Sequence, residues 1–282
     1  MPRSLVLIVL FAIIVVSRPA RGEDDLPWKY PIDLAIGKEG EIYIADLKLP
    51  GIWKFKEGPG AKLEKLVQGT SKYRTPLNAI RCLAVTDDGT LLAGDSATRE
   101  VYKVSPKGEL TSLTNGFIGI PITMAPQGTD VFVSDLELQR VWKVPLAGLE
   151  KGKTPEEFAV LGGARGLYLD KDELWILTSP APQIRRFSMD KKPTVVVKDL
   201  TFEFPHQIQR KDGVSYITDG YKRCVWKVKD DGSAEQWVSG APFVNPLGIR
   251  FQGNDLLLID PRAKGLFRIK PDAKVERILP AP

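Results

Sequence analysis

The sequence predicts an all-β fold assembled from six copies of one four-stranded unit. Turn-forming residues are abundant, with 25 Gly and 22 Pro among 282 residues, which suits many short strands better than long helices. One motif also recurs six times: a short apolar strand ending in Asp, a loop, and a strand of aliphatic–aromatic–basic–aliphatic pattern. An apolar content of 43% and a charged content of 27% indicate an ordinary globular protein.

This motif supplies the second and third strands of each unit. The aromatic position lies seven residues after the Asp position in every copy, and the Asp position advances by 49, 40, 43, 41 and 41 residues. We expect the Asp to accept loop N–H bonds rather than to act in catalysis, because a residue needed once is not repeated. We expect the aromatic row to pack between units. The Asp positions are Asp46, Asp95, Asp135, Asp219 and Asp260, with Thr178 in copy four, and the aromatic residues are Trp53, Tyr102, Trp142, Trp226 and Phe267.

A further strand precedes the Asp strand, and another follows the basic position. Pro or a small residue introduces the first strand, as at 31–34 and 205–208, and turn sequences such as 230–233 precede the last. A four-stranded sheet of this size buries both faces only by stacking radially with its neighbours, which predicts a six-bladed β-propeller of four-stranded antiparallel blades. The predicted blades are 31–69, 79–116, 120–162, 164–200, 204–240 and 245–280.

The first and last copies each contain all four strands. We therefore expect the ring to close by side-chain packing rather than by a shared blade, with Trp28 helping to seal the seam.

The N-terminus has the pattern of a secretory signal peptide. Arg3 precedes an apolar run at 5–16, and a small-residue ending at Ala20 and Gly22 follows. The run is shorter than the roughly 20 residues of a membrane-spanning helix, so an uncleaved anchor is the weaker alternative. We expect residues 1–22 to be removed and 23–282 to form the propeller, secreted or periplasmic, with no membrane attachment after cleavage.

Removal of this segment lowers the net charge. The whole chain has 40 basic and 35 acidic side chains, or +5. Residues 1–22 contain three Arg and no acid, which leaves 37 against 35, or +2, in the mature chain. No global field for nucleic acid or membrane is expected. We also expect a monomer.

The Pro-led first strand, the Gly-containing turn and the Asp-ending strand resemble NHL-type repeats over residues 30–280. More broadly, the chain is similar to the six-bladed propeller superfamily that includes gluconolactonase/regucalcin-like lactonases and strictosidine synthase-like enzymes. That superfamily contains hydrolases, lyases and non-catalytic binders, so the resemblance implies a fold and not one function. It also implies that ligands bind where the inner strands begin around the axis.

The resemblance implies a divalent cation held by Glu, Asn and Asp in gluconolactonase-like enzymes, and this sequence departs from that pattern. The only nearby oxygen ligands are Asp33, Asn78 and Asn245, too few for calcium. A single His, His206, excludes a zinc site of several His. We therefore expect no metal and no cofactor, and no disulfide between Cys82 and Cys224.

The residues at the start of the inner strands predict an anion-binding pocket. Arg81, Arg165 and His206 occupy equivalent positions in copies two, four and five, and guanidinium groups bind carboxylate, sulfate or phosphate bidentately. Two alternatives stay open: each Arg pairs with an acid such as Asp33 or Glu203, and His206 is only a polar residue at a strand end. The extra segment 70–77 is a candidate rim. The candidate ligand-binding residues are Arg81, Arg165, His206, Asp33, Tyr73, Arg74 and Asn245, and no catalytic residue is assigned.

These observations favour an exported module that binds a ligand or partner through the axial mouth, with a small anionic molecule or a protein as the partner. An alternative is a lactonase- or esterase-like hydrolase of the gluconolactonase type with a divergent, carboxylate-poor site. A third interpretation is an interaction platform that uses its loops and no pocket.

Overall fold

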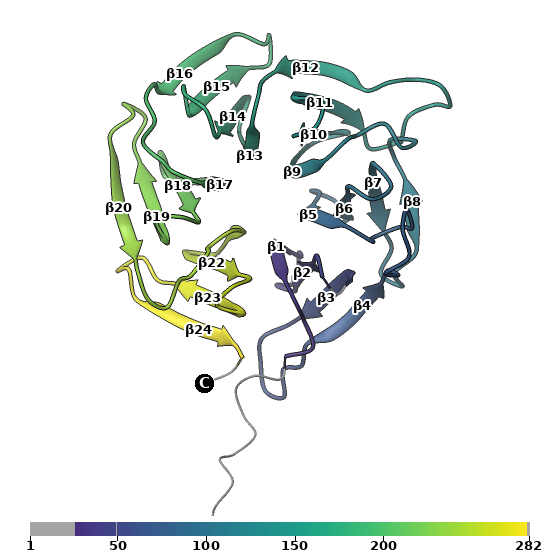
Figure 1. Cartoon of the computed structure of the whole chain (residues 1–282), viewed down its shortest axis with the longest axis horizontal. Coiled ribbons are helices and arrows are strands. Elements are labelled where there is room, and N and C mark those ends of the chain that lie inside the picture. Colours follow the sequence, from purple (N-terminus) through teal and green to yellow (C-terminus); the bar gives the residue numbers. More distant parts are fainter. Residues whose placement is uncertain (1–25, 49, 281–282) are drawn as a thin grey trace, which may run out of the picture.

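The computed structural model describes residues 26–48 and 50–280, and these residues form a six-bladed β-propeller (Figure 1). Each blade is a sheet of four consecutive antiparallel strands, and the blades follow the chain in order around one axis. The predicted fold class is confirmed. The predicted signal peptide, 1–22, lies outside the described residues. Within the described part of the chain, no helix is long and apolar enough to cross a bilayer.

The strands are numbered from the inner to the outer edge of each blade. Blade 1 contains β1 (Pro31–Ile36), β2 (Ile42–Asp46), β3 (Gly51–Phe55) and β4 (Glu64–Gln68); blade 2 contains β5 (Ile80–Val85), β6 (Leu91–Asp95), β7 (Glu100–Val104) and β8 (Leu110–Ser112). Blade 3 contains β9 (Pro121–Gln127), β10 (Asp130–Asp135), β11 (Arg140–Pro145) and β12 (Glu156–Val160); blade 4 contains β13 (Ala164–Asp170), β14 (Glu173–Thr178), β15 (Ile184–Ser188) and β16 (Pro193–Val197). Blade 5 contains β17 (Pro205–Lys211), β18 (Val214–Asp219), β19 (Cys224–Val228) and β20 (Ala234–Ser239); blade 6 contains β21 (Ile249–Gln252), β22 (Asp255–Asp260), β23 (Gly265–Ile269) and β24 (Val275–Leu279).

The ring closes by packing between two complete blades, as predicted. Blade 1 takes all its strands from the start of the fold and blade 6 takes all of its strands from the end. Trp28, only 3% exposed, joins the hydrophobic cluster that contains Leu34 of blade 1 and Ile259 of blade 6. The large indole thus fills the seam, and burial of apolar surface replaces a shared sheet.

The recurrent Asp has the structural role that its periodicity predicts. Asp219 is fully buried, and its carboxylate accepts hydrogen bonds from the backbone N–H groups of Glu203 (2.9 Å) and Phe204 (3.0 Å), just before the inner strand. In blade 4, where Thr178 replaces Asp, the Thr178 hydroxyl instead donates to the carbonyls of Pro180 and Pro182 in the loop that follows (both 2.9 Å). In the other five blades the Asp carboxylate fixes the segment that leads into the inner strand and so positions the first residue of that strand.

Cys82 in β5 and Cys224 in β19 are both buried and form no disulfide with each other.

Candidate functional site

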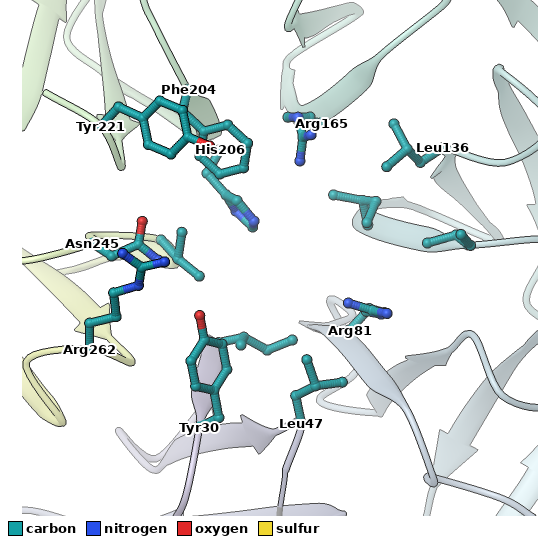
Figure 2. Close-up of a pocket in the computed structure, with 14 residues that line it drawn as sticks. Tyr30, Leu47, Arg81, Leu136, Arg165, Phe204, His206, Tyr221, Asn245 and Arg262 are labelled. Carbon is teal, nitrogen blue, oxygen red and sulfur yellow. The ribbon is translucent and has the colours of Figure 1, made fainter. Parts of the chain in front are cut away.

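The inner strands begin around a cavity of about 390 Å³ on the propeller axis (Figure 2). The residue at the first inner-strand position of every blade lines it, as the repeat alignment predicts. The lining residues are Tyr30, Ile32, Leu47, Arg81, Ile120, Ile122, Leu136, Arg165, Phe204, His206, Tyr221, Asn245, Leu247 and Arg262. We call this cavity the mouth.

A β-bulge turns most of these first residues toward the mouth. In β1 the pairing register shifts between Pro31 and Asp33, in β5 between Ile80 and Cys82, and in β13 between Ala164 and Gly166. The residue that is skipped in each case is the lining residue: Ile32, Arg81 or Arg165. Because a bulged residue leaves the ladder, its side chain can be re-aimed away from the face that its neighbours share.

Arg81 and Arg165 are held by matching contacts. The Nε–H of Arg81 donates to the hydroxyl of Ser96 (3.1 Å), and that of Arg165 donates to the hydroxyl of Ser179 (2.6 Å). Each serine directly follows the Asp position of its blade. A side chain held through Nε keeps its two terminal nitrogens available as a fork of donors.

The two arginines do not pair with the acids that the sequence suggests, Asp33 and Glu203. Within residues 26–48 and 50–280, neither Arg81 nor Arg165 forms an ion pair. The two proposed acids are engaged elsewhere: Asp33 pairs with Arg250 and Glu203 pairs with Lys222. Burial lowers the pKa of both guanidinium groups, which nonetheless stay charged at neutral pH.

His206 points into the mouth next to Arg165 and across from Arg81 (Figure 2). Burial, followed by repulsion from Arg165 and Arg81, lowers the pKa of His206 to about 3, so the ring is neutral at neutral pH. Its Nδ1 is buried and has no hydrogen-bond partner among the described residues. An unpaired acceptor is tolerated better than an unpaired N–H, so we place the proton on Nε2, where the ring can donate to a ligand.

An aromatic pair forms one wall of the mouth. The Phe204 and Tyr221 rings are stacked, with centroids 4.7 Å apart, and the guanidinium carbon of Arg165 lies 4.6 Å from the Phe204 centroid. Tyr221 is 66% exposed, so an apolar face extends from the cavity toward solvent. The cation–π contact also limits where Arg165 can swing.

Arg262 completes the set of cations and was missed by the sequence reasoning. It lies in the loop between β22 and β23, where its backbone N–H donates to Asp260 (3.0 Å), and it lines the mouth beside Asn245 (Figure 2). Among the described residues it forms no ion pair. No Asp or Glu occurs among the described lining residues, so the mouth is lined by three cations and no acid; Asp95, which lies outside the lining, raises the pKa of Arg81 against the effect of burial.

One signal in the sequence could have revealed how the lining is organised. The residue after the Asp position matches the first inner residue of the same blade: Leu47 accompanies Ile32, Leu136 accompanies Ile122, and a serine accompanies each arginine. Apolar pairs and Arg–Ser pairs therefore alternate over blades 1 to 4.

Three other predicted site residues lie away from the mouth lining. Asp33 is fully buried and accepts hydrogen bonds from the Leu83 N–H (2.9 Å) and the Gln207 amide (2.7 Å). Tyr73 is 77% exposed and contacts Arg74, whose guanidinium carbon lies 5.2 Å from the Tyr73 ring. Neither residue of this pair lines the cavity, whereas Asn245 does.

No cluster of three or more His, Cys, Asp or Glu that could hold a metal ion occurs in the part of the chain that the structure describes. The chemistry available at the mouth is therefore that of guanidinium, imidazole, phenol and amide donors over aliphatic surface.

No protein-family model matches the chain, and no curated protein matches it. Among solved structures, a gluconolactonase from Xanthomonas campestris has a TM-score of 0.71 at 14% identity, with 89% of this chain and 86% of that chain covered. A chain of the nidogen/laminin complex has a TM-score of 0.69 at 16% identity (89% and 93% covered), and virginiamycin B lyase from Staphylococcus aureus has 0.63 at 17% (88% and 84% covered). The chain therefore shares the six-bladed propeller fold of these structures.

Proposed function

We propose that the protein is a binding module whose mouth takes a small organic anion. One observation carries the proposal: Arg81, Arg165 and Arg262 line one cavity that has no acid among its described residues. Three clustered cations without acids repel one another, which adds nothing to fold stability and suits an anionic ligand.

The size and lining of the mouth support an organic ligand. A volume of about 390 Å³ lies within the range of small-molecule pockets, roughly 300–1,000 Å³. Aliphatic side chains such as Ile32, Ile122 and Leu247 cover much of the wall, and they would bury a carbon skeleton while the guanidinium groups bind its charged end.

The hydrolase alternative has less support. Ester or lactone hydrolysis needs a general base whose pKa lies near the working pH. His206, with a pKa of about 3, is a weak base, and no carboxylate lies among the described lining residues to orient it.

Calorimetric titration of the purified protein tests the proposal. We expect hexanoate to bind and the uncharged hexanamide not to bind. The double variant Arg81→Ala/Arg165→Ala should lose about 100-fold in hexanoate affinity, because a hydrogen bond to a charged group contributes about 1.5–3 kcal/mol. The charge-matched control is Lys107→Ala/Lys151→Ala, in which both lysines are exposed and lie outside the lining. Equal binding of hexanoate by the two double variants would contradict the proposal.

We also propose that the module works outside the cytoplasm, because residues 1–22 have the composition of a signal peptide. Mass spectrometry of the full chain after expression in a secreting host should find a mature N-terminus near residue 23. A protein that keeps its first residues would contradict this.

A further inference from the structure

We propose that the ligand of the mouth is a polycarboxylate, with two or three carboxylates on a short aliphatic skeleton. This inference rests on the proposed function and specifies its ligand class.

The first argument is the charge that a ligand must balance. The mouth contains three guanidinium groups, a neutral His206 and no acid among its described residues. A ligand with one carboxylate would leave two cations uncompensated in a partly enclosed cavity. Each further carboxylate removes one of them and gains another charge-assisted pair.

The second argument is the distribution of the cations around the axis. Arg81 comes from blade 2, Arg165 from blade 4 and Arg262 from blade 6, so every second blade contributes one. Figure 2 shows Arg262 across the mouth from Arg81. Cations spread in this way match several anionic groups held apart on one molecule better than they match a single compact group.

The third argument is the presence of separate polar partners at each side. On one side, Figure 2 shows His206 next to Arg165, one of the two serine-anchored arginines. At the rim, Figure 2 places the Asn245 amide next to Arg262 and the Tyr30 hydroxyl on the same side of the mouth. Each side therefore offers a guanidinium together with at least one neutral group that can donate a hydrogen bond.

The fourth argument is the apolar surface between these two sides. Ile32, Ile122 and Leu247 lie at the first inner positions of blades 1, 3 and 6. Methylene groups between the carboxylates would cover these side chains, whereas a compact inorganic anion would leave them wet.

The test compares ligands that differ in carboxylate number. Butyrate, glutarate and tricarballylate are titrated into the wild-type protein, with pyrophosphate as the compact multianion. We expect affinity to rise at least about 10-fold from butyrate to glutarate, as one added charge-assisted contact predicts, and to rise again for tricarballylate. Pyrophosphate should bind more weakly than tricarballylate.

The variant Arg262→Ala then locates the second subsite. It should remove the advantage of glutarate over butyrate, because the second carboxylate loses its guanidinium partner. Arg277→Ala is the control, because it removes an exposed cation of the same blade that lies outside the lining. Circular dichroism melts show that each variant is folded.

The outcomes separate the two proposals. If butyrate and glutarate bind equally well, the polycarboxylate assignment fails and the anion-binding function stands. If pyrophosphate binds tightest, the aliphatic skeleton is wrong. If none of these anions binds the folded wild type, the proposed function itself fails.

Discussion

In the described part of the chain, arginine side chains are paired with an acid at one end of the propeller axis and unpaired at the other. At the mouth, Arg81 and Arg165 form no ion pair with any described residue, and hydroxyl groups of serine hold them. At the far end of the same inner strands is a second cavity of about 250 Å³, lined mostly by apolar side chains such as Met124 and Leu167. Its one arginine, Arg250, pairs with the buried Asp33. The far-end arginine thus belongs to the core, whereas the mouth arginines contribute nothing comparable to the core.

The pairing at the far end is a network across the axis. Gln207 donates to Asp33 (2.7 Å) and accepts from the Ile249 N–H (3.0 Å), and Arg250 donates to the Leu83 carbonyl (3.1 Å). Four inner strands are therefore tied together by three side chains. A network of this kind stabilises the fold only when every member is satisfied.

The largest effect should come from breaking that network. Asp33→Asn leaves Arg250 without its counter-charge, and removal of one partner of a buried pair costs about 3 kcal/mol in the free energy of unfolding. Urea denaturation measures it. The control is Glu137→Gln, whose exposed pair with Arg99 should contribute less than about 1 kcal/mol. If Asp33→Asn lowers the free energy of unfolding no more than the control does, the far-end arginine has no special role in stability.

A second effect concerns pH. Below its unfolded pKa of 6.5, His206 takes up a proton in the unfolded chain, but the folded protein does not protonate it until pH about 3. The unfolded state therefore binds more protons, and stability falls as pH drops from 6.5 toward 3, by at most about 1.4 kcal/mol per pH unit.

Chemical denaturation of wild type and His206→Gln between pH 7 and pH 4 isolates this effect from the carboxylates that titrate in the same range. The difference in stability between the two proteins should change with pH. In Arg81→Ala/Arg165→Ala, the pKa of His206 should rise because both arginines depress it, and NMR titration of the single imidazole measures that rise. An unchanged pKa would mean that the charges of Arg81 and Arg165 do not affect the protonation of His206.

A smaller effect is expected when the mouth arginines are removed. Arg81→Ala/Arg165→Ala loses two hydrogen bonds to serine but also relieves repulsion among unpaired cations. We expect the free energy of unfolding to change by less than about 1 kcal/mol, in contrast to Asp33→Asn. A loss of several kcal/mol would show that the mouth arginines are structural after all.

The fold was predictable from the sequence because the signal is repeated. Each copy alone is a weak pattern. The step from the Asp position to the aromatic position, as from Asp219 to Trp226, is seven residues in every copy, and this constant spacing fixes strand order and register. The first inner positions were also predictable, since equivalent residues of a radial repeat meet at one end of the axis. Arg81, Arg165 and His206 lie together for that reason.

The rest of the site depended on features that a repeat pattern does not contain. Asp33 was a predicted ligand-binding residue, but its neighbour Ile32 lines the mouth while the Asp33 carboxylate is fully buried and accepts hydrogen bonds from Leu83 and Gln207. Arg262 comes from the loop two residues after the Asp position, where Tyr221 of blade 5 also lines the mouth. Strand alternation does not set the direction of a loop side chain, so the repeat pattern did not predict it. Whether Arg81 is paired is a matter of three-dimensional neighbours, and only the structure could decide it.

The smallest effect tests whether the serine hydroxyls orient the mouth arginines before a ligand binds. Ser96→Ala and Ser179→Ala each remove the hydroxyl that receives the Nε–H of an arginine, while the charge of the mouth is kept. The freed side chains regain rotamer freedom that binding must remove again, which costs about 0.5–1.5 kcal/mol for each side chain. We expect each variant to weaken glutarate binding about threefold to tenfold in calorimetry, with a less favourable binding entropy and unchanged stability. Ser105→Ala, a serine far from the mouth lining, serves as the control. Unaltered affinity in both mouth variants would mean that the guanidinium groups are oriented by the bulge and the Phe204 ring alone, and that the serines accompany the arginines only as neighbours in the repeat.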